Sequence, residues 1–219
     1  IANITGQSFG GLMASGLLNV VGEHMNGLQI AGIANITASK LNGVQVALCN
    51  YATKARGLQI GLVNYYKEDM KGFQLGLVNA NPDTKVQMMV YGGNATPANI
   101  GVRFKNQLFY TILGVGSMYQ GLNNKFSASA SYRAGLSFPL YKGLSISGDL
   151  GYQHIEAFDN KDEVIPKRLY ALQARANLEY QFTKKFGIFA TGGYGVTRFY
   201  NKSSNYDKGA IIEAGIVLF

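Results

Sequence analysis

The chain has 219 residues and a formal net charge of +8, and only 15% of its residues are charged, against about 25% in an average soluble domain. Its 28 glycines, 14 tyrosines and 12 phenylalanines, with only 4 prolines, favour β structure with many tight turns. A basic chain can bind nucleic acid or an anionic membrane surface, but its basic residues stand singly or in pairs, which predicts no nucleic-acid partner.

An eight-residue phrase, Gly-Leu-Gln-Ile-Gly-Leu-Val-Asn in its clearest copy, recurs through the N-terminal part of the chain. Its copies occupy residues 27–35, where it is one residue longer, and residues 43–50, 57–64 and 72–79. The closing asparagines follow one another at intervals of 14 to 16 residues. Self-similarity at a short, nearly fixed period is typical of stacked repeats. We therefore predict that residues 1–94 form a solenoid-like stack of β repeats.

Each repeat alternates between two kinds of residue, as a strand does. Leu58, Ile60 and Leu62 fall on one face, and Gln59 falls on the other. We expect stacking to bury the apolar face and the recurrent asparagine to lie at a corner, where its side chain can bond to backbone groups. Cys49 stands where other copies have leucine, alanine or valine, so we expect a small buried side chain.

The repeats contain two kinds of candidate contact residue. The aligned glutamines form either a binding ladder or a structural polar ladder, and the structural interpretation is favoured. The variable segments that return the chain between repeats carry basic residues, which are better candidates for contact with a partner. The candidate interaction surface comprises Gln29, Gln45, Gln59, Gln74, Lys40, Arg56 and Lys67.

From residue 95 the pattern changes to long, strict alternation, which is clearest in residues 126–138. Strands of about nine to eleven residues with one apolar face are what a transmembrane β-barrel needs, whereas strands of globular proteins usually have about five or six residues. We predict an all-β chain in which residues 95–219 form a small antiparallel transmembrane barrel of about eight strands. The expected strands are 98–105, 107–118, 125–138, 143–155, 168–182, 186–200 and 209–219.

The eighth strand decides where the barrel begins. Bacterial single-chain barrels have even numbers of strands, and residues 84–91 are the natural first strand. Residues 86–94, however, also resemble a degenerate last repeat. With eight strands, both ends of the barrel would lie in the periplasm, as would the repeats unless they pass through or around the barrel. With seven strands, the repeats would emerge on the cell surface.

The charged residues indicate which face of the barrel strands points inward. Arg133, Asp149, Arg175 and Glu179 all fall on polar strand faces, and a basic residue at the lipid midplane costs about 2–4 kcal/mol. We therefore predict that they form a polar network in a lumen filled by side chains, which excludes an open channel. Glu213 shares a strand face with Phe219, so if Phe219 faces lipid, the last strand needs a bulge or a cover.

Two features resemble known families. The chain ends on an apolar strand with a terminal phenylalanine, which resembles the last strand of Gram-negative outer-membrane β-barrel proteins. The repeat phrase is similar to the surface repeats first described in leptospiral proteins and common in Bacteroidota, where such repeats can precede a small outer-membrane barrel. The resemblance implies a location in the outer membrane of a Gram-negative bacterium, in contact with its lipid, and it brings no established catalytic residues.

The sequence offers few groups for catalysis. His24 is expected in a solvent-exposed return. His154, Glu156 and a serine of a neighbouring strand could form the triad of a lipid-modifying barrel enzyme, but their spacing is not diagnostic. No cysteine–histidine cluster indicates zinc, and the acidic residues Asp159, Asp162 and Glu163 are expected to be solvated. We predict no enzymatic activity, no cofactor and no metal.

The favoured hypothesis is a non-enzymatic outer-membrane protein. Its barrel would be the anchor, and its repeats would present an interaction surface, as a structural or accessory subunit in complex with another outer-membrane or envelope protein. The alternatives are a lipid-modifying or small-ligand-binding barrel and a fully soluble β-sandwich.

Overall fold

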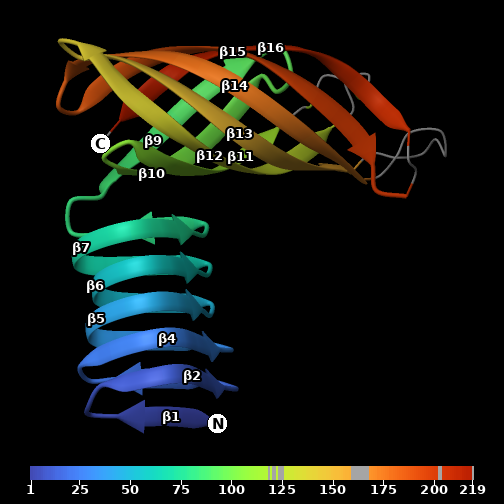
Figure 1. The fold of residues 1–219 in the computed structure, drawn as a ribbon. Helices are drawn as coiled ribbons and strands as arrows, with labels where there is room; N and C mark the ends of the chain where they lie inside the picture. Colours follow the sequence, from blue (N-terminus) through green and yellow to red (C-terminus); the bar gives the residue numbers. More distant parts are fainter. Residues whose placement is uncertain (118, 120–121, 123–125, 159–167, 202–203, 219) are drawn as a thin grey trace. The chain divides into compact units, whose positions relative to one another are not determined.

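The computed structural model describes residues 1–117, 119, 122, 126–158, 168–201 and 204–218. The chain divides into two compact units, Ile1–Thr84 and Lys85–Phe219 (Figure 1). The division lies before the predicted boundary at residue 94, because residues 85–93 belong to the second unit. No helix in the described part of the chain is long and apolar enough to cross a membrane. Phe219 and the acidic residues Asp159, Asp162 and Glu163 lie outside the described residues.

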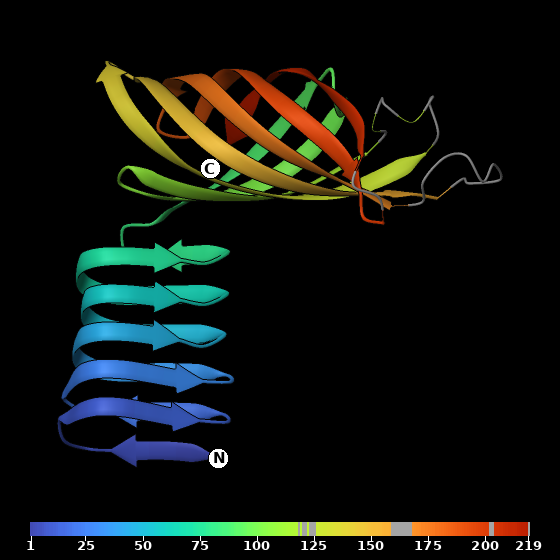
Figure 2. The same ribbon diagram turned by 45° about the vertical axis from the view of Figure 1, so that its right-hand side comes forward.

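The first unit, here called the repeat stack (residues 1–84), is a pile of parallel coils (Figure 2). Equivalent residues pair from coil to coil, so that Gly43 pairs with Gly27 on one side and with Gly57 on the other. The period of the sequence therefore becomes the register of the sheet. The strands are β1 (Ala2–Thr5), β2 (Phe9–Ser15), β3 (Leu18–Val21), β4 (His24–Ala31), β5 (Ala34–Val46), β6 (Cys49–Ile60), β7 (Val63–Leu75) and β8 (Val78–Ala80).

Each coil changes direction at two edges. The tight-turn edge consists of the two-residue turns 16–17, 32–33, 47–48, 61–62 and 76–77. At the opposite return edge the chain bends at residues 6–7 and 22–23, and in later coils within β5, β6 and β7, where the pairing register shifts after Thr37 and Ala52. The variable segments of the sequence lie at the return edge.

The interior of the repeat stack changes character between its two edges. Beside the return edge it is apolar, with a core of Val21, Met25, Leu41, Ala52 and Ala55. Met13 packs with this core from the position that glutamine occupies in later coils. Beside the tight-turn edge the buried side chains are the recurrent glutamines and asparagines. Leu62 is 49% exposed, and Leu58 and Ile60 point outward beside the buried Gln59. The expectation that stacking buries this apolar face is therefore wrong. Amides can bond to one another from coil to coil, so the glutamine face can be buried with its hydrogen bonds satisfied.

The second unit is a closed antiparallel barrel of eight strands, which confirms the predicted fold class and contradicts a β-sandwich. The order around the barrel is β10-β11-β12-β13-β14-β15-β16-β9. The strands are β9 (Lys85–Gly93), β10 (Ala98–Asn106), β11 (Phe109–Ser117), β12 (Ser127–Tyr141), β13 (Leu144–Ala157), β14 (Arg168–Thr183), β15 (Phe186–Phe199) and β16 (Asn205–Leu218).

Strand β9 is the segment that, from the sequence, can be either the last repeat or the first barrel strand. It pairs with β10 on one side and with β16 on the other, so it closes the barrel. Met88 near its start pairs with Leu218 at the end of β16, so the barrel begins and ends at the same rim. The two-residue turns 107–108, 142–143 and 184–185 lie at that rim.

Alternation along the barrel strands places polar side chains inside and apolar side chains outside. In β14, Arg175, Asn177 and Glu179 are buried, whereas Leu172 and Leu178 are about half exposed. Glu213 of β16 is also buried, with 5% exposure. The last strand thus needs neither a bulge nor a cover at Glu213, because this carboxylate points into the lumen.

Candidate functional site

The glutamine row lies inside the repeat stack and does not form a contact surface. Nε2 of Gln45 donates to Oε1 of Gln29, that of Gln59 to Gln45, and that of Gln74 to Gln59, each at 2.8 Å. Gln29, Gln45 and Gln59 are fully buried. The interpretation as a binding ladder is therefore wrong, and the row is a structural polar ladder.

The asparagine row runs along the inner side of the tight-turn edge. Nδ2 of Asn35 donates to Oδ1 of Asn50 at 3.1 Å and to the carbonyl of Val46 at 3.0 Å. Asn50 repeats this arrangement in the next coil, with 2.9 Å to Asn64 and 2.7 Å to the carbonyl of Ile60. The asparagines therefore take the corner position that the sequence predicts, and they bond the carbonyl groups at the strand ends.

We expect Gln45→Leu to loosen the repeat stack, because leucine has a similar size but cannot continue the amide ladder. Nε2 of Gln59 would keep only its 3.5 Å bond to the carbonyl of Tyr65, and Oε1 of Gln29 would keep only the bond from Thr37. Each buried hydrogen bond that is lost costs about 0.5–1.5 kcal/mol. Hydrogen exchange in residues 43–60 of the full-length protein should become faster. Arg56→Gln, at an exposed position, is the control and should change stability by no more than about 0.5 kcal/mol. Unchanged exchange in Gln45→Leu would contradict the structural role.

The basic candidates lie at or near the return edge, where the sequence places them. Arg56 and Lys67 are exposed, and Lys40 is half-buried. Lys54, which pairs with Lys40 in register, forms an ion pair with Glu68 at 3.2 Å. Both side chains of that pair are at least half exposed, and such surface pairs contribute only about 0–1 kcal/mol. These charges can therefore exchange partners at little cost.

The last coil continues into the barrel unit through residues 81–84. Nδ2 of Asn81 donates to the hydroxyl of Tyr66 at 2.6 Å, and Oδ1 of Asn81 accepts from the backbone NH of Asp83 at 2.8 Å. Partial burial raises the pKa of Tyr66 above its ordinary value. The segment before β9 is thus a hydrogen-bonded turn of the repeat stack rather than a long linker.

The structure also shows whether Cys49 and His24 of the repeat stack are buried or exposed. Cys49 is exposed, so the expectation of a buried side chain is wrong. It begins β6 directly after the turn at 47–48, and the aligned Val63 is exposed as well. His24 is exposed as expected.

The four charged residues predicted for the lumen are buried there, and they fall into two clusters. In the first, Nη2 and Nε of Arg133 donate to the two carboxylate oxygens of Asp149, both at 2.8 Å. Arg133 also lies 3.3 Å from Glu213, which accepts from Nε of Arg175 at 3.1 Å. This chain of charge-assisted hydrogen bonds joins β12, β13, β14 and β16 across the barrel interior.

Glu179 belongs to the second cluster. Its two carboxylate oxygens accept from Nη1 and Nη2 of Arg103 at 2.6 and 2.9 Å. Arg103 and Glu213 are not among the residues that the sequence predicts for the lumen network. Arg103 falls on the same side of β10 as the buried Asn99, so parity along the predicted strand could have identified it. The two clusters thus contain three arginines and three carboxylates, and the part-buried Lys105 donates to Ser137 beside them.

Side chains fill the middle of the lumen. The space between Arg103, Arg133 and Phe189 measures about 10 Å³, which holds no more than about one water molecule. We expect the purified protein to produce no steady current steps in planar lipid bilayers. Reproducible ohmic steps would contradict a plugged barrel. A porin reconstituted in the same membranes is the positive control.

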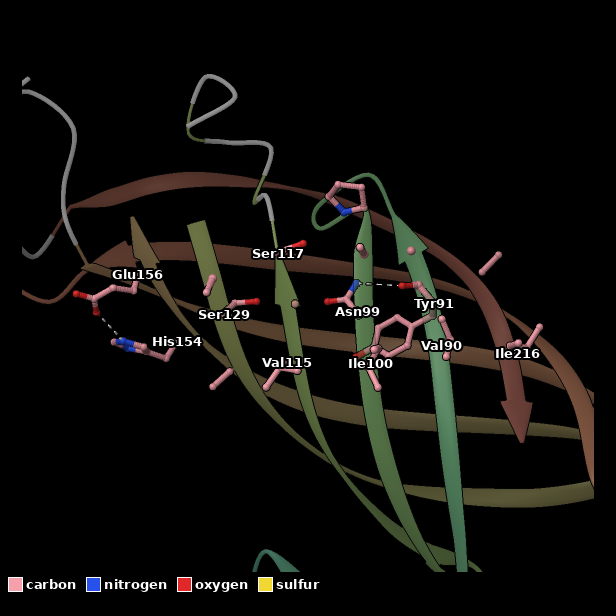
Figure 3. Close-up of a pocket in the computed structure, with 17 residues that line it drawn as sticks. Val90, Tyr91, Asn99, Ile100, Val115, Ser117, Ser129, His154, Glu156 and Ile216 are labelled. Carbon is pink, nitrogen blue, oxygen red and sulfur yellow. Dashed lines mark hydrogen bonds and ion pairs between the residues drawn. The ribbon is translucent and has the colours of Figure 1, made fainter. Parts of the chain in front are cut away.

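A shallow hollow of about 1110 Å³ lies on the barrel wall formed by β9 to β13 and β16 (Figure 3). Val90, Ile100 and Val115 line it, together with alanines and glycines, and His154 and Glu156 lie at one edge. The small side chains account for the depression, because they leave the backbone uncovered. This is an apolar site with a polar group at one end.

The predicted triad is only partly assembled beside this hollow. Nε2 of His154 lies 3.3 Å from Glu156, but Nδ1 faces the hydroxyl of Tyr200 at 2.7 Å. Ser129, on the neighbouring strand, is buried and accepts from Nε2 of Gln153 at 2.8 Å. In the described ranges no serine is hydrogen-bonded to His154. Within those ranges, no group of three or more histidine, cysteine, aspartate or glutamate side chains could hold a metal ion.

No protein-family model and no curated protein matches the sequence. The fold is similar to that of Neisserial surface protein A, with 9% identity, a TM-score of 0.40, and coverage of 61% of this chain and 93% of that one. It is also similar to the outer-membrane protein Ail of Yersinia pestis in a phospholipid bilayer nanodisc, with 14% identity, a TM-score of 0.39, and coverage of 62% and 99%. A designed transmembrane β-barrel has 13% identity, a TM-score of 0.37, and coverage of 61% and 91%.

Proposed function

We propose that this chain is a non-enzymatic outer-membrane protein of a Gram-negative bacterium, whose barrel is a membrane anchor. The observation that carries the proposal is the polarity of the closed barrel, with paired charges inside and apolar side chains outside. Leu150 and Ile212 on the outer wall are 71% and 66% exposed. Water would be a poor solvent for so many exposed apolar side chains on one wall, and lipid is the solvent that suits them.

The aromatic side chains support the same proposal, because they gather near both ends of the barrel. Exposed aromatic side chains at membrane–water interfaces form the girdles typical of such barrels. Beside the rim of two-residue turns lie Phe138, Tyr141, Tyr180, Phe182 and Phe186. Toward the opposite rim lie Phe126, Tyr152, Phe158 and Tyr200.

Membrane fractionation tests the anchor. The full-length protein should remain in outer membranes through an alkaline carbonate wash, and its gel mobility in detergent should change on boiling, because a folded barrel resists detergent without heat. Recovery in the soluble fraction, with the same mobility before and after boiling, would refute the proposal.

The proposal places the repeat stack on the periplasmic side. Outer-membrane barrels have short periplasmic turns and longer external loops, and β9 begins at the rim of two-residue turns. Protease added to intact cells should leave residues 20–80 uncut, and the same protease should cut there once the outer membrane is permeabilised. Cleavage in intact cells would place the repeats on the cell surface.

We further propose that the repeat stack presents its charged return edge to another envelope protein, as an accessory subunit of an outer-membrane complex. The exposed Lys67 and the half-buried Lys40 support this, because both lie at the edge where the charged side chains of the repeat stack gather. Lys40→Glu with Lys67→Glu should release a partner that co-purifies in mild detergent. The control Lys184→Glu, in a barrel turn, should retain it. Purification of the wild type as a lone monomer would count against this role.

The hollow beside His154 favours a second candidate, a barrel that binds or modifies a lipid or another small apolar ligand. An apolar depression with a histidine–carboxylate pair at its edge has the elements of such a site. His154→Ala would then alter the lipid A or phospholipid profile of the outer membrane. An unchanged profile would leave the anchor as the better proposal.

A further inference from the structure

The charged residues of the repeat stack are confined to one part of each coil. None lies in residues 12–18, 28–35, 44–50, 58–64 or 73–79, which form the tight-turn edge and the strands beside it. They are Glu23, Lys40, Lys54, Arg56, Lys67, Glu68, Asp69, Lys71 and Asp83. One edge of the repeat stack is therefore uncharged through successive coils, and the other edge is charged.

The uncharged edge exposes ladders of large apolar side chains. Ile33, Leu48 and Leu62 occupy equivalent turn positions and are 52%, 48% and 49% exposed. Beneath them lies the buried amide interior, whereas beneath the charged return edge lies an apolar core. At the return edge, charged side chains cover an apolar core, as on the surface of a protein in water. At the tight-turn edge, exposed apolar side chains cover a polar interior, which is the opposite arrangement. The outer wall of the barrel has this opposite arrangement too, with apolar side chains outside and polar side chains inside.

The backbone at the tight-turn edge is hydrogen-bonded from coil to coil. The NH groups of Ile33, Cys49 and Val63 donate to the carbonyls of Leu17, Ile33 and Leu48 at 2.8 to 2.9 Å. The asparagine row supplies further bonds to the carbonyls at the strand ends, including that of Ile60. Satisfied backbone groups are the condition that hydrocarbon imposes on a protein surface. A surface that only meets water has no such requirement.

The composition of this edge favours lipid over a protein partner. Binding hot spots of protein interfaces are enriched in tryptophan, tyrosine and arginine and poor in leucine and valine, and the exposed turn positions hold leucine and isoleucine.

Arg56 and Lys71 are exposed and aligned in register. Arg56 precedes Ile60 by four residues, roughly 13 Å along a strand. An interfacial element dips about 5–10 Å into the membrane, which would place these two cations at the level of the phosphates.

We infer that the tight-turn edge of the repeat stack rests on a lipid leaflet, with its outer leucine and isoleucine side chains in the acyl region and Arg56 and Lys71 at anionic headgroups. The inference rests on the proposed membrane anchor, because residues 81–84 alone separate β8 from β9. A short tether of this kind keeps the local lipid concentration high for the repeat stack. The charged return edge stays in water, free for a protein partner.

Cys49 allows a direct test, because it is the only cysteine of the chain and is exposed at this edge. A nitroxide on Cys49 of the full-length protein, in phosphatidylethanolamine–phosphatidylglycerol vesicles, would report collisions with oxygen, which dissolves in lipid, and with a nickel chelate, which stays in water. Two matched proteins carry Cys49→Ser with either Lys67→Cys, at the return edge, or Leu150→Cys, on the barrel wall. We expect the Cys49 label to resemble the Leu150 position and to favour oxygen several-fold more than the Lys67 position.

Each other outcome rejects the inference in a distinguishable way. If Cys49 favours nickel while position 150 favours oxygen, the barrel is in the bilayer and the repeat stack is not on it, so the anchor stands alone. If position 150 itself favours nickel, the proposed anchor fails and the lipid contact fails with it. If the Cys49 label is shielded from both reagents, protein covers the edge, as in contact between two copies of the chain.

A charge placed on the edge gives a second measurement. Leu48→Asp with Leu62→Asp should move the Cys49 label from oxygen-favouring to nickel-favouring in the same vesicles, while circular dichroism of the protein stays unchanged. Lys40→Asp with Lys67→Asp, at the return edge, should leave the label where it was. If the aspartates at positions 48 and 62 do not change the label's accessibility, the edge does not contact lipid.

Discussion

Replacing Asp149 by alanine is expected to lower the free energy of unfolding of the barrel by about 3–5 kcal/mol, because it leaves a buried arginine without its main partner. Arg133 is only 2% exposed and donates two hydrogen bonds to this carboxylate. The hydroxyl of Tyr110 and Nδ2 of Asn177 also donate to Oδ2 of Asp149, each at 2.8 Å. One substitution therefore removes a hydrogen-bond acceptor from donors on three other strands.

Urea titration of the protein folded into phospholipid vesicles would measure this loss. The control Glu156→Ala removes the partner of the exposed Arg168, and such a surface pair is worth about 0–1 kcal/mol. The paired replacement Arg133→Met with Asp149→Leu should cost less than Asp149→Ala, because no charge then remains without its partner. A loss below about 1 kcal/mol in Asp149→Ala would mean that water reaches and solvates Arg133, contrary to a filled lumen.

The barrel could be predicted from the sequence because charge resolved the ambiguity that alternation leaves. A period of two residues separates two strand faces but does not say which one is inside. Arg133 and Asp149 removed that ambiguity, since neither is tolerated in lipid. Glu213 was harder to place, because strand parity gives it the same side as Phe219, and a terminal phenylalanine that faces lipid would carry this carboxylate to the lipid side.

The repeat stack could not be predicted as fully, because its alternating segments contain no charge. Gln59 and Leu58 alternate as clearly as Arg133 and Ala134 do, but an amide can face water or complete a buried ladder. The choice depends on whether a neighbouring coil offers a matching amide at hydrogen-bonding distance. That match is a property of the stacked register, which the spacing of 14 to 16 residues only implies. The assumption that apolar faces are buried then gave the wrong side.

Gly57→Ala is expected to destabilise the repeat stack by about 3 kcal/mol or more, from two separate causes. Gly57 has a φ of +129°, a region that is essentially restricted to glycine and costs other residues about 1–3 kcal/mol. A Cβ here would also lie 2.0 Å from the carbonyl oxygen of Gly43 in the preceding coil. Because that neighbour is backbone, the overlap is relieved only by moving the coils apart. The ladders of Gln45 to Gln59 and of Asn50 to Asn64 would then lengthen together.

Two other glycines separate these causes. Gly11 has a φ of +113° with no atom near its Cβ position, and Gly10 has neither a positive φ nor a close neighbour. Thermal unfolding of the full-length protein in detergent, with hydrogen exchange in residues 43–64, should rank Gly57→Ala well below Gly11→Ala in stability, and Gly10→Ala near the wild type. The boiling-dependent gel shift of the barrel should be unchanged, because Gly57 belongs to the other compact unit. If Gly11→Ala and Gly57→Ala were equally destabilising, the recurrent glycine would serve only the backbone conformation. A clear difference would show that the repeat keeps glycine because successive coils touch there through their backbones, which brings the amide ladders within bonding distance.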